Sequence, residues 1–329
     1  MRTLQAALSR MEAHRARSAD GPTQDGPKAS VKQLFLPAME PPKRAMPNHL
    51  ARSSLFAPIA KRQRTFHRET TLVSRSDAVI TYTGEQLDEA DADLCLQLIF
   101  EARLFPLGQP VTLVRSALLK SMGRCVGKHD YEWLHRRMKA LTAATLYLEA
   151  KKPDGSTRYV VGKTDAFHIL TSFKYDDDSE RYTFTLDRQW VTLFSRSEFA
   201  LLDWEKRLQI KRGKDMAKAI QRLVATSAEL RQRYALDWLK ERLQYTSPIR
   251  KFREALRLAM AELERVEIIA AGSIEMSTKG KEQAVWTRLP TGTKQRGDDA
   301  RLEKSVHPQN AQVLLFTECQ QTAGAAAQT

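Results

Sequence analysis

The stretch Ser247–Glu267, SPIRKFREALRLAMAELERVE, decides the fold of the second half of this chain. Ser247 and Pro248 match an N-cap followed by the first helical residue. The apolar positions lie on one stripe of an α-helix: Ile249, Phe252, Leu256, Met260 and Leu263. The exposed face opens with cations: Arg250, Lys251, Arg253 and Arg257. Such a helix fits a DNA major groove, and the alternative is an ordinary solvated surface helix.

The apolar pattern of this helix occurs earlier in the chain as well. Leu134, Met138, Leu141, Ala144 and Leu146 recur at a constant offset as Leu256, Met260, Leu263, Val266 and Ile268. Each copy is preceded by another helix and followed by a predicted hairpin, and this order is typical of a winged helix. The sequence therefore predicts an α+β fold with two tandem winged-helix domains. A coincidence between two amphipathic helices is the alternative.

Composition divides the chain into four parts. Residues 1–75 are rich in Pro, Ala, Ser and basic residues without apolar periodicity, so we expect a disordered basic region. Residues 76–196 and 197–289 are the predicted winged-helix domains, and residues 290–329 a disordered C-terminal tail. Asp154-Gly155 lies between two β-rich runs, 145–150 and 157–161, and predicts a hairpin. A helix is expected over 199–208.

The overall charge favours a polyanionic partner. Lys and Arg exceed Asp and Glu by 14 charges, and the pI is about 9.7. The chain has no apolar run long enough to span a bilayer and no signal-peptide core, so we expect no membrane partner. The cysteines, Cys95, Cys125 and Cys319, are odd in number and widely spaced. They favour a reducing cytoplasm over a disulfide framework or a structural zinc site.

Candidate DNA contacts occur in both halves. Arg250, Arg253 and Arg257 have the spacing of one helical stripe, and arginine is suited to bidentate contact with guanine. In the first half the outward cations are Lys128, His129, Arg136 and Lys139, with Lys151, Lys152 and Arg158 on the predicted wing. Glu132 near the start of the first-half helix would repel phosphate unless it accepts a bond from cytosine. We therefore expect the second domain to dominate sequence recognition.

Signals for catalysis are weak. The segment Gly123–His129, GRCVGKH, departs from a phosphate-binding loop in spacing and in its last residue, so it is interpreted as a turn between helices. The His pair and helical Tyr of a nicking enzyme are absent. Asp176–Asp178 is interpreted as a solvated turn, and Asp91 and Asp93 as residues that favour a helix N-terminus. We predict no enzyme activity, no catalytic residues, no cofactor and no metal.

Five motifs resemble the TrfA-type plasmid replication initiators: RAMPNHLARSSLFAP (Arg44–Pro58), VITYTGEQL (Val79–Leu87), PLGQPV (Pro106–Val111), FALLDWEKRLQI (Phe199–Ile210) and SPIRKFREAL (Ser247–Leu256). The resemblance implies two winged-helix domains that bind direct repeats, called iterons, in double-stranded origin DNA. It implies opening of an AT-rich segment, with single-stranded DNA as a possible partner. It also implies recruitment of the host helicase, host initiator and sliding clamp, and a switch between dimer and DNA-binding monomer.

The resemblance also directs attention to clamp-binding peptides, which are similar to Gln-Leu-x-Leu-Phe. One candidate contains Gln312, Leu315 and Phe316, and a second contains Gln33, Leu34 and Leu36 followed by Pro37. Either is equally well explained as a chance apolar run. Three rival functions remain open: a winged-helix repressor of inverted half-sites, a nicking nuclease, and a non-specific DNA-coating protein.

Overall fold

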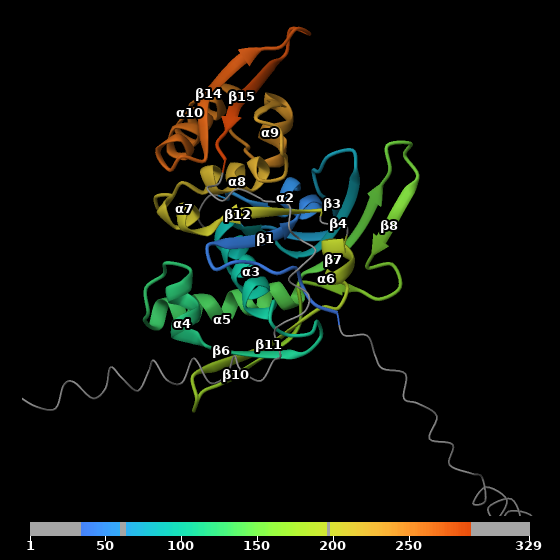
Figure 1. Ribbon diagram of the computed structural model, residues 1–329, viewed down its shortest axis with the longest axis vertical. Helices are drawn as coiled ribbons and strands as arrows, with labels where there is room; N and C mark the ends of the chain where they lie inside the picture. Colours follow the sequence, from blue (N-terminus) through green and yellow to red (C-terminus); the bar gives the residue numbers. More distant parts are fainter. Residues whose placement is uncertain (1–33, 60–63, 196–197, 291–329) are drawn as a thin grey trace, which may run out of the picture. The chain divides into compact units, whose positions relative to one another are not determined.

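The computed structural model describes residues 34–59, 64–195 and 198–290 (Figure 1). Its buried apolar side chains form two clusters, which define a first lobe, residues 34–204, and a second lobe, residues 210–290. Helix α7 (Trp204–Gln209) runs from one lobe to the other. The sequence predicted a boundary between residues 196 and 197. The first core extends beyond it because strand β12 (Phe199–Asp203) pairs with β1 (Lys43–Pro47).

The other elements of the first lobe are α2 (Asn48–Arg52), β2 (Phe56–Ala57), β3 (Phe66–Thr71), β4 (Ala78–Glu85), β5 (Leu87–Asp88), α3 (Glu89–Ala102), β6 (Pro110–Val114), α4 (Arg115–Ser121), α5 (Lys128–Ala143), β7 (Thr145–Lys151), β8 (Thr157–Val161), β9 (Phe167–His168), β10 (Leu170–Asp176), β11 (Arg181–Leu186) and α6 (Trp190–Phe194). The second lobe contains α8 (Asp215–Val224), β13 (Arg231–Ala235), α9 (Leu236–Arg242), α10 (Ile249–Arg265), β14 (Ile269–Met276) and β15 (Glu282–Arg288).

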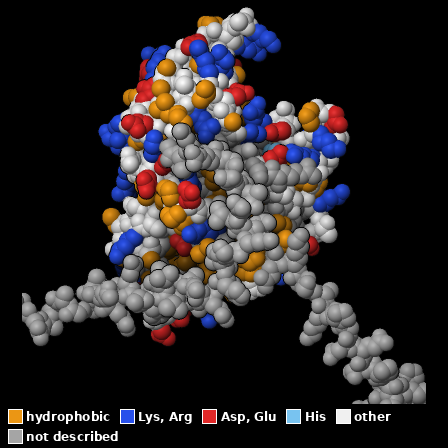
Figure 2. All heavy atoms as spheres, in the orientation of Figure 1, with side chains coloured by type: hydrophobic (Ala, Val, Ile, Leu, Met, Phe, Trp, Pro, Cys, Tyr) orange, Lys and Arg blue, Asp and Glu red, His pale blue; other side chains and the backbone are white. Residues whose placement is uncertain are grey.

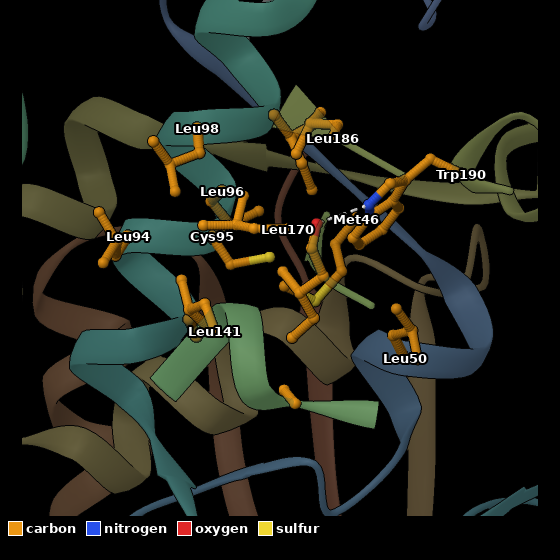
Figure 3. Close-up of a cluster of buried hydrophobic side chains, with 14 of the residues drawn as sticks. Met46, Leu50, Leu94, Cys95, Leu96, Leu98, Leu141, Leu170, Leu186 and Trp190 are labelled. Atoms are coloured by element: carbon orange, nitrogen blue, oxygen red, sulfur yellow. Dashed lines mark hydrogen bonds between the residues drawn. The ribbon is translucent and has the colours of Figure 1, made fainter. Parts of the chain in front are cut away.

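The N-terminal segment belongs to the core of the first lobe. Met46 is fully buried and Leu50 is 1% exposed. Figure 3 shows both side chains in the same apolar cluster as Leu170 and Trp190. The prediction of a disordered region is therefore wrong for residues 34–59 and 64–75, while residues 1–33 lie outside the described part. The scattered apolar residues of this N-terminal segment are buried because its strand β1 pairs with β12, which lies about 150 residues later in the chain.

Substitution of Leu50 by alanine tests this placement. We expect a loss of about 2–5 kcal/mol in the free energy of unfolding, because a fully buried leucine loses its contacts and leaves a cavity. Denaturant titration measures the loss. Leu34→Ala is the matched control, since Leu34 is 37% exposed in the same segment. Equal, small effects of both substitutions would show that the segment does not contribute to the core.

The order strand, helix, helix, hairpin occurs in both lobes (Figure 1): β6, α4, α5, β7 and β8 correspond to β13, α9, α10, β14 and β15. Every apolar position of the sequence repeat is buried in both copies, so the internal repeat is confirmed. Gly123–Gly127 connects α4 to α5, as the sequence indicated. The predicted hairpin of β7 and β8 is also formed, and its Gly155 has the left-handed φ of +83° that favours glycine.

The two copies differ in where their first strand pairs. In the second lobe β13 pairs with β15, which gives a sheet of order β13-β15-β14. In the first lobe β6 instead pairs with β11, in a separate sheet of order β10-β11-β6, while β7 joins the sheet β3-β4-β7-β8. Strand β10 contacts α5, so one side of α5 is flanked by strands. The repeated helices α5 and α10 therefore have different surroundings, although their apolar sequence patterns are similar.

The prediction of a helix over residues 199–208 is partly wrong. Residues 199–208 form strand β12 followed by α7. Ala200 and Leu202 are buried while Leu201 is exposed, which is the alternation of a strand. Pairing with β1 satisfies the backbone of this segment, so the tertiary partner overrides its helical pattern.

Candidate nucleic-acid interface

Helix α10 presents an uncapped amino end. The helix begins at Ile249, and Pro248 occupies the N-cap position without a side-chain hydrogen bond, so the predicted cap by Ser247 is not formed. The first turn contains no acidic residue. The first N–H groups therefore have no side-chain cap, and the partial positive charge of the helix end has no carboxylate beside it in the turn. An anion such as a DNA phosphate is the ligand that this end favours.

The cations of α10 divide into paired and unpaired ones. Within the described residues its ion pairs are Arg253–Glu282 and Arg265–Glu262. Arg250, Lys251 and Arg257 are exposed and make no ion pair there. The opposite face is buried against α8 and β14 through Phe252, Leu256, Met260 and Leu263. Three predicted contact residues are thus available to a ligand.

Arg253 has a different environment. Its Nη2 and Nε donate to Glu282 Oε2 at 2.6 and 3.2 Å, and Glu282 is the first residue of β15. The hydrogen bond from this carboxylate raises the pKa of Arg253 above its usual value. Arg253 is half-buried and ties α10 to the hairpin that follows it. We conclude that Arg253 positions the hairpin and is less available for a base than Arg250 or Arg257.

The hairpin of β14 and β15 ends in a cationic turn. Lys279 and Lys281 are exposed there, on either side of Gly280, whose φ is +71°. Figure 2 shows Lys and Arg side chains at this tip. The sequence reasoning missed both lysines, although the segment Ser277–Glu282, STKGKE, combines a turn glycine with flanking cations. They extend the cationic surface from α10 along the hairpin.

In the first lobe the predicted residues form two groups. Lys128, His129, Arg136 and Lys139 are all exposed on α5, and so is Glu132. Lys151, Lys152 and Arg158 lie on the hairpin of β7 and β8. Lys152 is exposed and Lys151 is half-buried. Arg158 Nη1 donates to Glu198 at 2.5 Å, so this guanidinium already has a carboxylate partner.

A buried ionic network surrounds the amino end of α3. Asp88 is the N-cap of α3, and Asp91 completes the capping box by accepting from the backbone N–H of Asp88 at 2.8 Å, which agrees with its predicted role at a helix N-terminus. The same carboxylate also accepts from Arg137 Nε on α5 at 2.5 Å and from Arg64 Nη1 at 2.8 Å. Asp91 is completely buried. Its guanidinium partners are what make burial of this charge tolerable.

Two further carboxylates of α3 join the lobes. Glu89, 1% exposed, accepts from Arg207 Nη2 at 3.0 Å and from Arg222 Nη2 at 2.5 Å. Asp93 accepts from Arg207 Nε and Lys218 Nζ, each at 2.5 Å. Arg207 lies on α7, and Arg222 and Lys218 lie on α8. The two lobes therefore share charged contacts in addition to their separate apolar cores.

Sequence reasoning missed this network. Its visible signal is the series of acidic residues in Glu89–Ala102, EADADLCLQLIFEA, where carboxylates share a helix with a long apolar run. Arg242 on α9 adds a contact of another kind: its Nε and Nη2 donate to the carbonyl oxygens of Arg52 and Ala51, each at 2.7 Å. Burial lowers the pKa of Arg242 to about 9. This guanidinium fastens α2 of the first lobe to the second lobe.

The candidate clamp-binding peptides fall largely outside the described residues. Gln312, Leu315, Phe316 and Gln33 are not described. Leu34 is 37% exposed, but Leu36 is 5% exposed and packs in the first core. The peptide that includes Leu36 would have to leave that core to dock, so the structure disfavours it.

Within residues 34–59, 64–195 and 198–290, no group of three or more His, Cys, Asp or Glu side chains has the arrangement of a metal site. None of the helices in these ranges is long and apolar enough to cross a membrane.

The amino-acid sequence matches a known protein family. The sequence model described as TrfA protein matches residues 28–275, which is more than half of the chain. No curated protein matches. Among solved structures, the crystal structure of SeMet derivatives of domain 2 and domain 3 of RctB is similar with a TM-score of 0.45 and 12% identity, and covers 74% of this chain and 98% of that one. A second structure of RctB domains 2–3 has a TM-score of 0.43 and 14% identity, with coverage of 73% and 96%.

Proposed function

This chain belongs to the TrfA protein family, and we propose that it is a plasmid replication initiator that binds direct repeats in double-stranded origin DNA. It promotes opening of an AT-rich segment, whose single strands become a second partner. It recruits the host helicase, host initiator and sliding clamp, and it changes between a dimer and a DNA-binding monomer. It acts in the bacterial cytoplasm as a binding protein without catalytic residues. Family membership supports these roles.

The observation that carries DNA binding is the cationic surface of α10, with Arg250 and Lys251 at its amino end and Arg257 about two turns further along. Arg250, Lys251 and Arg257 have no carboxylate partner among the described residues, whereas Arg253 and Arg265 on the same helix pair with Glu282 and Glu262. Like charges at the positive end of a helix are unfavourable unless an anion binds there. We interpret α9 and α10 with β14 and β15 as a winged helix, with α10 in a major groove and Lys279 and Lys281 near the backbone.

The first lobe would be a second winged-helix unit with a weaker role on duplex DNA. Lys128, Arg136 and Lys139 would supply phosphate contacts. Glu132 lies on the same exposed surface and repels phosphate, and β10 flanks α5 on one side. Both features reduce the fit of α5 to a groove. The second lobe is therefore expected to determine sequence preference.

A salt-titrated footprint on DNA flanking the gene tests this function. Regular direct repeats of protection are the expected result, because an initiator monomer binds each repeat in the same orientation. Inverted half-sites would instead support the alternative, a winged-helix repressor that binds as a symmetric dimer. Equal binding of random and origin DNA at raised salt would indicate a coating protein. A nicked product from supercoiled origin DNA with Mg²⁺ would indicate a nuclease.

The pairing of Arg253 with Glu282 leads to a separate prediction. Arg253→Ala and Glu282→Ala should each weaken DNA binding to a similar, modest extent, because either change removes the ion pair that joins the start of β15 to α10. The double variant should lose little more than either single one. A double-mutant cycle of dissociation constants measures the coupling. Additive losses, or a large loss for Arg253→Ala with none for Glu282→Ala, would show that Arg253 contacts DNA directly.

For the clamp, we propose the peptide that contains Gln312, Leu315 and Phe316. Deletion of residues 311–318 should weaken binding to the sliding clamp roughly tenfold or more, which corresponds to about 1.4 kcal/mol. Binding to origin repeats should stay unchanged. Surface plasmon resonance with immobilised clamp measures the first effect and a gel shift the second. Undiminished clamp binding would assign the contact to another segment.

A further inference from the structure

A shallow pocket on the first lobe is not explained by groove binding. Its volume is about 610 Å³, within the range of small-molecule sites. It lies where α5 meets the strands β10 and β11, and the amino end of α4 closes one side. In the second lobe β13 pairs with β15 and α10 packs against α8 and β14, so among the described residues α10 does not have the strand arrangement that β10 and β11 form beside α5. The pocket therefore arises from the different strand pairing of the first lobe.

Aromatic rings form the walls of this pocket. The rings of Tyr175 and Tyr182 lie 4.7 Å apart between centroids. The guanidinium of Arg115 stacks 3.8 Å from the centre of the Tyr131 ring and also pairs with Glu180. His135 Nδ1 lies 3.1 Å from the Tyr182 hydroxyl. These contacts hold the rings in place before any ligand binds, which lowers the entropy cost of binding.

Charged groups lie at the rim. Lys128 and Arg136 are exposed on α5 and make no ion pair with a described residue. They are separated by about two turns of helix, roughly 12 Å along its axis. Glu132 lies between them and is also exposed. A cation at each end and one carboxylate in the middle suit a ligand with phosphates at its ends and a hydrogen-bond donor at its centre.

We propose that this pocket binds an unpaired nucleotide of a DNA strand. The half-exposed ring of Tyr175 offers a surface on which a base can stack, while Arg115 already covers one face of the neighbouring Tyr131 ring. A base within a duplex exposes only its edges, so such stacking requires an unpaired base. Lys128 and Arg136 contact phosphates on either side, and Glu132 accepts from an exocyclic amino group, which favours adenine or cytosine over thymine.

The separation of the two cations favours a strand over a free nucleotide, since one monophosphate cannot reach both. The acidic turn Asp176–Asp178 at the end of β10 repels phosphate, so the strand would follow α5 and avoid that turn. This inference rests on the proposed origin binding and gives the lobes different tasks. The second lobe binds the origin duplex sequence-specifically, and the first lobe binds a single strand after the duplex has opened.

The test uses the full chain with a short single-stranded oligodeoxyadenylate as the probe, followed by fluorescence anisotropy. Tyr175→Leu removes the stacking ring and should weaken binding roughly fivefold to a hundredfold. Tyr175→Phe is the matched control, because it retains the ring and should bind as the unmodified protein does. Unchanged binding by Tyr175→Leu, with a circular dichroism spectrum that shows it folded, would overturn the proposal and leave the pocket as a candidate protein-docking surface.

Two further measurements are needed. One distinguishes a DNA strand from a free nucleotide as the ligand, and the other distinguishes single-strand binding from duplex binding. Deoxyadenosine monophosphate should compete poorly with the oligonucleotide; equal competition would overturn the strand assignment in favour of a free nucleotide. The variant Arg250→Ala/Arg257→Ala should lose duplex binding but keep oligonucleotide binding. If that variant lost oligonucleotide binding while Tyr175→Leu kept it, single strands would bind at α10 and the pocket assignment would fail without affecting the proposed duplex binding.

Discussion

Replacement of Glu89 by alanine is expected to lower the free energy of unfolding by about 3–5 kcal/mol, because it leaves buried guanidinium groups without their carboxylate. Arg222 is fully buried and forms an ion pair with Glu89. Arg207, also fully buried, would keep Asp93 as its one ion-pair partner among the described residues. Since these arginines come from α7 and α8, the loss should loosen the contact between the lobes. Denaturant titration gives the free energy.

Glu205→Ala is the control for this change. Glu205 is exposed on α7, close in sequence to Arg207, and such surface substitutions usually change stability by less than about 0.5 kcal/mol. Glu89→Gln should fall between the two, because the amide retains an acceptor but loses the charge. If Glu89→Ala were as stable as the control, the network would be dispensable and the apolar cores alone would join the lobes.

The second large effect concerns DNA. The double variant Arg250→Ala/Arg257→Ala should lose about 2–6 kcal/mol of binding free energy on the origin repeats, if each guanidinium makes one good base contact. If one of these arginines contacts a phosphate instead, its loss should reduce the slope of log K against log salt concentration by about one unit. Fluorescence anisotropy over a range of salt concentrations separates the two cases.

Arg181→Ala/Arg188→Ala is the matched control, since both arginines are exposed on the first lobe and outside α5 and α10. It removes the same charge and should change repeat binding little. Equal losses from both double variants would show that net charge, and not the position on α10, drives binding. Proper folding of each variant can be verified by its unfolding midpoint.

Much of the local structure follows from sequence patterns. The periodicity of Leu256, Met260 and Leu263 predicts a helix and its buried face, and each of these side chains is buried. The hairpin at Asp154-Gly155 follows from turn chemistry. The TrfA resemblance, carried by short motifs spread over much of the chain, is confirmed by the family match to residues 28–275. Helix periodicity, turn residues and short motifs each depend on residues that are close together in the sequence, so they can be recognised without the structure.

Other features depend on partners distant in the chain. Residues 34–59 have no periodicity, yet Met46 and Leu50 are core residues because β12 supplies the strand that β1 needs. Asp93 has the sequence signature of a helix start, but its partners Arg207 and Lys218 follow more than a hundred residues later. No local pattern specifies which acid meets which base across such a distance.

By itself the sequence determined the repeat, the family and the helix face on which Arg250, Arg253 and Arg257 lie. Only the tertiary structure decided which of these arginines is available, because Glu282 on β15 pairs with Arg253 and leaves Arg250 and Arg257 without an ion-pair partner among the described residues. It also decided that β6 pairs with β11, which creates the aromatic pocket beside α5. Side-chain periodicity is a property of neighbours along the chain, whereas charge pairing and strand partners depend on segments that folding brings together.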